Sequence, residues 1–306
     1  MKDKMETVKV YVGADRSQAL AVKVLEHSIK RYATVDVEVV PMIDLPVREP
    51  KDPRNLARTG FSFSRFCIPK LAGYTGKALY LDADMLVFRD IKSLWEIPFD
   101  GAKVVIQREV KHAQETVKKA GAPTSRRKQC SVMLLDCERL DWDIDKIIDD
   151  LDAGHYDYEM LMNDLVILDE SEIKFGVPFE WNSLEYFDES TCLIHYTDMQ
   201  TQPWTSCKNL NGFLWLNEIR RMLKSGSLRM QDVEEEIMRG YLRPSLKRDV
   251  RYGQYVPTFL KCQFDKFNMR FEQSRNYVPH KKVYANKKRR LEAVKAQRQA
   301  TENNFN

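Results

Sequence analysis

The sequence predicts an α/β protein with a mixed, mostly parallel, Rossmann-like sheet flanked by helices, followed by a helical, basic C-terminal extension. Short apolar strand patterns alternate with amphipathic helix patterns from Val8 to His195. From Leu210 onward the pattern is helical, and its last segment is rich in Lys and Arg. A chain of 306 residues is long enough for one large α/β domain with an appended segment.

The first strand, helix and second strand define the parallel part of the sheet. Residues 8–12 (VKVYV) form an apolar strand pattern, and residues 19–29 carry apolar side chains at helical spacing. Residues 35–40 (VDVEVV) predict the next strand, and four prolines within residues 41–53 mark a long connection. Ligands of parallel sheets bind beyond the carboxyl ends of the strands, so Asp15, at the exit of the first strand, is a candidate site residue.

Two acidic residues interrupt the apolar stretch at residues 77–88 (KALYLDADMLVF). Side chains alternate along a strand, so Asp82 and Asp84 point the same way and Ala83 turns to the other face. Two carboxylates between apolar flanks cost several kcal/mol unless a cation or strong donors compensate them. A divalent metal explains the pair, and capping of a turn or of the following helix explains it as well.

The segments on either side of this strand continue the α/β alternation. Residues 61–74 predict a helix interrupted near Pro69. It carries Arg65, which is either a phosphate ligand or a solvated surface charge. A short helix is expected at residues 91–95 and a strand at 103–106.

The middle of the chain adds one strand, one helix and an isolated acid. Residues 108–128 are polar and predict a loop, either a mobile cover or a solvated segment. Residues 130–136 (CSVMLLD) form a buried strand pattern, followed by an amphipathic helix that ends near Leu151. Residues 158–168 predict a helix or a helix-to-strand passage in which Asp164 stands alone among apolar residues.

The last strand of the α/β part is the run CLIH, which ends on His195. A single histidine at a strand end is either a structural residue or a ligand. The carboxylate pair of Asp82 and Asp84 favours the ligand interpretation, because imidazole and carboxylates together form a metal-binding set.

Charge is concentrated at the end of the chain. Residues 281–298 hold eight Lys or Arg and one acidic residue, so the formal charge of this segment is +7. The formal net charge of the whole chain is +4, so the remaining residues together carry −3 (4 − 7). The segment suits a solvated or disordered arm, or an arm that binds an anionic surface. No apolar run reaches the roughly 18–20 residues that a membrane span needs, and no signal peptide precedes the first strand, so we expect a cytoplasmic protein.

The order of motifs resembles the family 8 glycosyltransferases of GT-A fold. The matching features are a strand followed by Asp15, the motif YLDADMLV, the buried strand CSVMLL, the motif FEWN, and a strand that ends in His195 before a Pro-Trp pair. The resemblance extends from about residue 8 to Trp204. It implies a nucleotide-sugar-binding catalytic domain over residues 1–210 and a helical extension over 211–306.

The resemblance also implies roles for individual residues. Asp82, Asp84 and His195 would hold Mn²⁺ (or Mg²⁺) on the diphosphate of a nucleotide sugar. Arg65 would contact the same donor, and Asp15 would lie near the nucleotide. The implied reaction is transfer of a hexose from a UDP-sugar with retention of anomeric configuration.

The substrates and the catalytic group follow less directly. Asp164 is our candidate for a catalytic residue, and the expected acceptor is a saccharide, a lipid-linked sugar or a protein. The basic segment 281–298 could then place the enzyme at the inner face of a membrane, whereas a nucleic-acid partner is not expected.

Two other classes remain open on the sequence alone. Departures from the family pattern at Ser17, Ser131 and Gln202 favour a relative that binds a nucleotide sugar without transferring it. A haloacid-dehalogenase-like phosphatase also places Asp-x-Asp after a strand, although there the pair normally opens the domain.

Overall fold

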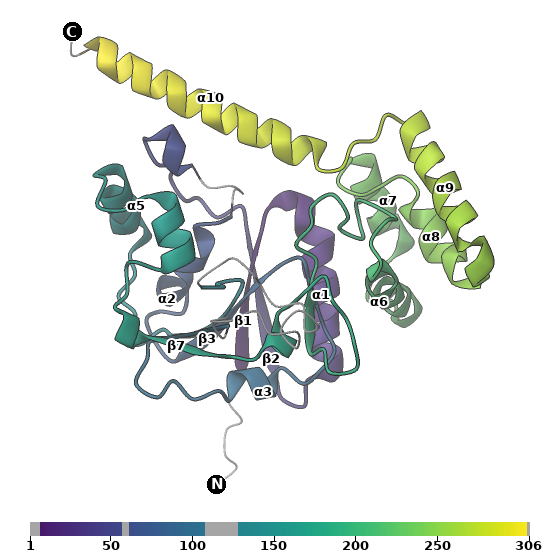
Figure 1. Ribbon diagram of the computed structural model, residues 1–306, viewed down its shortest axis with the longest axis horizontal. Coiled ribbons are helices and arrows are strands. Elements are labelled where there is room, and N and C mark those ends of the chain that lie inside the picture. Colours follow the sequence, from purple (N-terminus) through teal and green to yellow (C-terminus); the bar gives the residue numbers. More distant parts are fainter. Residues whose placement is uncertain (1–6, 57–60, 108–127, 305–306) are drawn as a thin grey trace.

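The computed structural model describes residues 7–56, 61–107 and 128–304, which contain a six-stranded central sheet with helices on both faces (Figure 1). The strands of this sheet are β1 (Val8–Ala14), β2 (Val37–Ile43), β3 (Lys77–Asp82), β5 (Val104–Gln107), β6 (Val132–Asp136) and β7 (Ile173–Val177). Their order is β2-β1-β3-β6-β5-β7, and of these six strands only β6 runs antiparallel to its neighbours. The predicted mixed, mostly parallel sheet is confirmed.

The adjacent strands β1 and β3 bring two candidate segments to one edge of the sheet. They pair in parallel, with Gly13 opposite Asp82. The carboxyl end of β1, which leads into Asp15, therefore lies beside the end of β3 that carries the acidic pair.

Alternation along the strands separates two layers of core. Val8, Val10 and Val12 of β1 pack on the face covered by α1, whereas Tyr11 packs on the opposite face with α5. The helices that flank the sheet are α1 (Ala19–Tyr32), α2 (Ile68–Leu71), α3 (Lys92–Trp95) and α5 (Ile144–Asp152). Side chains buried on both faces of the sheet explain why β1, β3, β5 and β6 read as short, nearly continuous apolar runs.

A second, three-stranded sheet connects the acidic pair to the C-terminal part of the chain. It contains β4 (Met85–Val87), β8 (Ser183–Leu184) and β9 (Leu193–His195), in the order β4-β9-β8. β4 and β9 are antiparallel, with Met85 opposite His195. This pairing places the end of β9 next to the bend that carries Asp84.

Residues beyond the second sheet are helical, as predicted. The helices are α6 (Gly212–Ser225), α7 (Met230–Met238), α8 (Leu246–Tyr252), α9 (Thr258–Ser274) and α10 (Lys281–Asn304). Trp215 and Ile219 of α6 are buried in a core that includes Leu20 and Val24 of α1. Shared burial of this kind stabilises the extension against the α/β part.

The basic segment forms α10, which runs from the α6–α9 helices toward the α5 side of the molecule (Figure 1). Arg290 of α10 forms a bidentate ion pair with Glu49, with Nη2 2.8 Å from Oε2, and Val294 is buried. The segment is therefore a continuous helix that docks on the loop after β2, while Lys287 and Lys288 stay exposed. None of the described helices is long and apolar enough to cross a bilayer.

Prolines lie in or directly after two of the predicted elements. β2 continues through Pro41, which a strand at the edge of a sheet tolerates because one of its sides has no partner. The helix predicted over residues 61–74, with an interruption near Pro69, is a 3-10 helix (Ser64–Cys67) followed by α2, with Pro69 in the first turn of α2, so the predicted interruption is confirmed.

The five-residue strand β7 was not predicted; Lys174 and Gly176 break its apolar pattern. The predicted polar loop at residues 108–128 lies outside the described residues except for Lys128.

Candidate metal and nucleotide-sugar site

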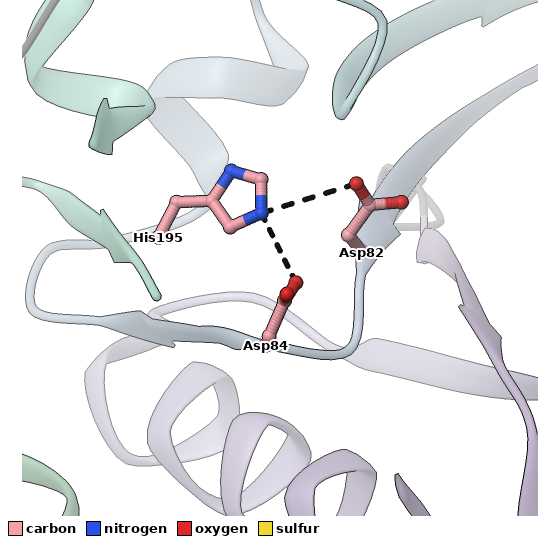
Figure 2. A group of neighbouring side chains, drawn as sticks. All are labelled: Asp82, Asp84 and His195. Atoms are coloured by element: carbon pink, nitrogen blue, oxygen red, sulfur yellow. Dashed lines mark ion pairs between the residues drawn. The ribbon is translucent and has the colours of Figure 1, made fainter. Parts of the chain in front are cut away.

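Three potential metal ligands meet at the carboxyl edge of the central sheet. Asp82 ends β3, Asp84 lies in the bend before β4, and His195 ends β9. Each offers one ligand atom, and these atoms all lie within 4.8 Å of one another. Figure 2 shows the His195 ring facing both carboxylates from the opposite strand. The predicted ligand set is thus brought together by the pairing of β4 with β9.

The three potential metal ligands suit a divalent cation. His195 Nε2 lies 3.0 Å from Asp84 Oδ1 and 3.9 Å from Asp82 Oδ2. The three side chains are only 7%, 15% and 16% exposed for His195, Asp84 and Asp82, respectively. Two carboxylates and one imidazole match the ligand preferences of Mn²⁺ and related ions, and the short separations let one ion contact all three.

Proton affinities in the cluster reflect its burial and charge. Burial raises the pKa of Asp82 above its ordinary value of 3.8, with the nearby Asp84 acting in the same direction and Arg65 opposing. Burial disfavours the charged form of His195, but the carboxylates of Asp84 and Asp82 outweigh it and raise the pKa of His195 above 6.5. A protonated imidazole thus offsets the two carboxylates, and a bound metal would replace that proton.

A buried amide orients the imidazole. His195 Nδ1 lies 3.0 Å from Asn182 Oδ1, and an amide oxygen can only accept, so Nδ1 carries the proton. The Asn182 side chain is held in turn by its Nδ2 atom, which donates to Gln107 Oε1 at 2.8 Å and to Ser131 Oγ at 3.0 Å. In the metal-binding form this tautomer leaves the Nε2 lone pair facing the carboxylates, as expected for a ligand supported by an outer hydrogen bond.

A second buried amide holds Asp84. Gln202 Nε2 donates to Asp84 Oδ2 at 2.9 Å and to the Tyr196 carbonyl at 3.1 Å. Gln202 is 1% exposed, and its Oε1 atom has no hydrogen-bond partner among the described residues. Gln202 therefore fixes the direction of one carboxylate ligand.

The other carboxylate is held by a tyrosine whose position depends on a glycine. Tyr80 Oη donates to Asp82 Oδ1 at 2.5 Å. A Cβ atom at Gly13 would lie 2.5 Å from Tyr80 Oη, which is closer than real Cβ contacts allow. Glycine at position 13 thus leaves the space that the hydroxyl needs.

Arg65 lies beside Asp82 rather than on the surface. Its Nη2 atom is 3.5 Å from Asp82 Oδ1, while Nη1 and Nε donate to the carbonyls of Cys130 (2.6 Å) and Ser62 (3.2 Å). Together with Asp82 it lines a cavity of about 150 Å³. The guanidinium is therefore fixed at the edge of the candidate site, where it also balances carboxylate charge.

The remaining two predicted site residues lie outside the three-ligand cluster. Asp15 caps the 3-10 helix Arg16–Gln18, accepting from the Ser17 backbone N–H at 2.8 Å. Asp164 ends the π-helix Met160–Asp164, and its backbone carbonyl accepts from Lys128 Nζ at 2.6 Å. Among the described residues, the cavity beside Asp82 is lined by Asn163 and not by Asp164, and the catalytic role of Asp164 stays a prediction.

Sequence reasoning did not assign roles to the residues that support the ligands. Asn182 is part of the FEWN motif, so the family resemblance could have indicated that it lies near the site. The sequence around Tyr80 and Gln202 did not indicate that they form hydrogen bonds with the acidic pair.

Comparison with known proteins supports the predicted family. Residues 2–135 match the family described as Glycosyl transferase family 8. Protein CDI of Arabidopsis thaliana is 29% identical over 245 residues, which cover 71% of this chain and 87% of that protein.

Solved structures of similar fold include three glycosyltransferases. The apo structure of the bifunctional WbbM has a TM-score of 0.51 at 14% identity, covering 72% of this chain and 50% of WbbM. The galactosyltransferase LgtC, in complex with donor and acceptor sugar analogs, has a TM-score of 0.50 at 15% identity, covering 72% and 96%. Apo GlyE of Streptococcus pneumoniae TIGR4 has a TM-score of 0.51 at 16% identity, covering 70% and 60%. This chain thus spans half of WbbM, and the GT-A-like fold is confirmed.

Proposed function

We propose that this chain, a relative of the family 8 glycosyltransferases, transfers a hexose from a nucleotide sugar, UDP-hexose, to an acceptor with retention of anomeric configuration. The observation that carries the proposal is the buried cluster of Asp82, Asp84 and His195 at the carboxyl edge of the sheet. Two carboxylates and an oriented imidazole at that edge are suited to hold a divalent ion where a nucleotide diphosphate binds.

The ligand residues and their supports would work as a unit. Mn²⁺ or Mg²⁺, when bound, supplies a Lewis acid for the charge that develops on the leaving diphosphate. Asn182 and Gln202 keep His195 and Asp84 in the binding orientation, so the site needs little rearrangement when the donor arrives.

Arg65 is the proposed cationic contact to the donor. Two of its three guanidinium nitrogens are committed to backbone carbonyls, and Nη2 faces Asp82 across 3.5 Å. A guanidinium held in this way at the wall of a cavity can donate to a phosphate oxygen without losing conformational freedom on binding. Asp15, at the end of β1, is the proposed nucleotide-side residue.

The acceptor side of the proposal is broader. We keep Asp164 as the candidate catalytic residue, and a saccharide, a lipid-linked sugar or a protein as the acceptor. The exposed basic side chains of α10, among them Lys287, Lys288 and Arg289, would suit contact with an anionic membrane surface, where each Lys or Arg contributes about 1 kcal/mol. This placement is compatible with the proposed cytoplasmic location.

The experiment is a transfer assay over a panel of UDP-hexoses and acceptors, with Mn²⁺ or with EDTA. We expect UDP release only with metal, and Asp82→Ala should lower it by more than about a hundredfold, since metal stabilisation is worth several kcal/mol. Asp141→Ala, at an exposed position, is the matched control and should act as wild type. NMR of the product anomer tests retention. Metal-dependent donor binding without turnover on any acceptor would instead identify a binding-only relative.

A further inference from the structure

His280 lies in the turn between α9 and α10, far outside the matched residues 2–135. Its backbone has a φ of +54°, a conformation that histidine and asparagine adopt more readily than most residues. The residue is nonetheless buried, with 7% of its surface exposed. The ring nitrogens of a buried histidine need hydrogen-bond partners within the protein or in a ligand.

One ring nitrogen of His280 is satisfied and the other is not. The ring forms a hydrogen bond to the backbone of Met199. Nε2 is buried and has no hydrogen-bond partner among the described residues, so the bond to Met199 is made through Nδ1. The bond raises the pKa of His280, as expected when a backbone carbonyl accepts from a ring N–H. Nδ1–H is therefore the donor, and in the neutral ring Nε2 carries a lone pair. An unsatisfied buried acceptor costs about 1–3 kcal/mol and indicates an absent partner.

The ring lies within electrostatic range of the candidate site. Asp15, at the end of β1, and Asp84, in the metal-ligand cluster, both interact electrostatically with it. Burial lowers the pKa of His280 below 6.5, with these two carboxylates opposing the shift, so the neutral form with a free Nε2 acceptor is favoured. Met199, the partner of Nδ1, lies in the loop between His195 and Gln202.

The turn is held in place on both sides. Gln200 Nε2 donates to Tyr284 Oη at 3.3 Å, and the Tyr284 and His280 rings pack edge to face at 6.3 Å. Lys282 Nζ lies 5.1 Å from the centre of the Tyr241 ring. These contacts attach the start of α10 to the loop after β9 and to the turn after α7, so the surroundings of His280 are held by packed side chains.

We propose that His280 binds the nucleotide-sugar donor, with Nε2 accepting a hydrogen bond from a hydroxyl group of its ribose or hexose. A hydroxyl fits better than a phosphate, because the neutral Nε2 accepts and two carboxylates lie nearby. The C-terminal extension thereby completes a donor site whose other residues come from the α/β part. This inference rests on the proposed function, since it needs a nucleotide sugar at this edge of the sheet.

Two substitutions separate this role from a structural one. Asn at position 280 tolerates the positive φ and offers an N–H near the place of Nδ1, so His280→Asn keeps the bond to Met199 and removes Nε2. Gln extends an amide to the place of Nε2, so His280→Gln loses the Met199 bond and keeps an acceptor. Tyr284→Phe removes the bond to Gln200 in the same turn and is the control.

The measurements are calorimetric titrations of UDP and of a UDP-hexose bound by the wild type, with Mn²⁺, together with melting temperatures, on the full chain. We expect His280→Asn to melt like the wild type and to bind about three- to tenfold more weakly, the equivalent of one neutral hydrogen bond. His280→Gln should melt lower and bind closer to wild type, and Tyr284→Phe should bind like wild type. Weakening toward UDP-hexose alone assigns the contact to the hexose, and weakening toward both ligands assigns it to the ribose.

Other outcomes overturn the inference. Wild-type affinity in His280→Asn, or weakening in His280→Gln alone, would make the histidine structural while the proposed function stands. Absence of UDP and UDP-hexose binding by the wild-type chain would refute the proposed function, and this inference with it.

Discussion

Replacing Asn182 by Ala should weaken metal binding without removing any metal ligand. The amide accepts from His195 Nδ1 at 3.0 Å and fixes the tautomer that presents Nε2. Outer hydrogen-bond partners of this kind change metal affinity by about 10–100-fold, or about 1.4–2.7 kcal/mol. The substitution also leaves His195 Nδ1 and Gln107 Oε1 without partners, at about 1–3 kcal/mol each, so the unfolding free energy should fall by about 2–6 kcal/mol.

The assay is Mn²⁺ titration followed by electron paramagnetic resonance, at a temperature where circular dichroism shows the variant folded. Ser131→Ala is the control, because it removes one bond to Asn182 at 3.0 Å and leaves the bonds to His195 and Gln107 in place. We expect the control to bind Mn²⁺ within about threefold of wild type, the range of a single weak hydrogen bond. A folded Asn182→Ala variant with wild-type Mn²⁺ affinity would refute the orienting role.

Three further predictions concern Gly13, the pH dependence of metal binding and the docking of α10. Gly13→Ala should displace the Tyr80 hydroxyl from Asp82. The melting temperature should fall, and Mn²⁺ binding should weaken by about three- to tenfold in the same titration. An unchanged melting temperature and Mn²⁺ affinity would refute the dependence of the Tyr80 position on Gly13. Mn²⁺ affinity should fall by about tenfold per pH unit below the raised pKa of His195, because a proton competes for Nε2, and should level off above it; calorimetry across pH with a flat profile would contradict this. Val294→Asp should detach α10, whose buried valine contributes about 1.5–3 kcal/mol, and speed proteolysis of that helix by about tenfold or more; an unchanged cleavage rate would exclude the docked helix.

The acidic pair was predictable because its signal is local. The apolar strand β3 ends at Asp82, and Asp84 follows two residues later in the bend, so both carboxylates stay at the same end of the strand. His195 needed a tertiary fact, the pairing of β4 with β9, which the sequence indicates only through the order of motifs. The family resemblance supplied that order.

The elements of the sheet were predictable to the extent that their patterns were long and regular. Residues 8–12 and 19–29 were assigned close to their observed bounds, since both bury a continuous apolar face. β7 was missed because its lysine and glycine weaken the alternation. The predicted interruption of the helix over residues 61–74 was found, because Pro69 starts a helical turn more readily than it continues one.

The proposed contribution of the C-terminal extension to the site had no sequence signal. His280 lies in the turn between α9 and α10, and the two residues after it, Lys281 and Lys282, are exposed and basic, as is typical of a solvated tail. The Lys and Arg content predicted that α10 is positively charged and that it could bind an anionic surface. It did not predict the ion pair of Arg290 with Glu49, which joins segments far apart in the chain.

The most direct test of the central claim is calorimetric titration of UDP into the full chain, with Mn²⁺ and with EDTA, for the wild type and for Asp82→Asn. A metal held by Asp82, Asp84 and His195 predicts that wild-type binding requires Mn²⁺ and that Asp82→Asn, which keeps the shape of the side chain but removes its charge, loses most of that binding. Equal UDP affinity with and without metal, or full Mn²⁺-dependent binding by Asp82→Asn, would contradict the assignment of this cluster as the metal site for the donor.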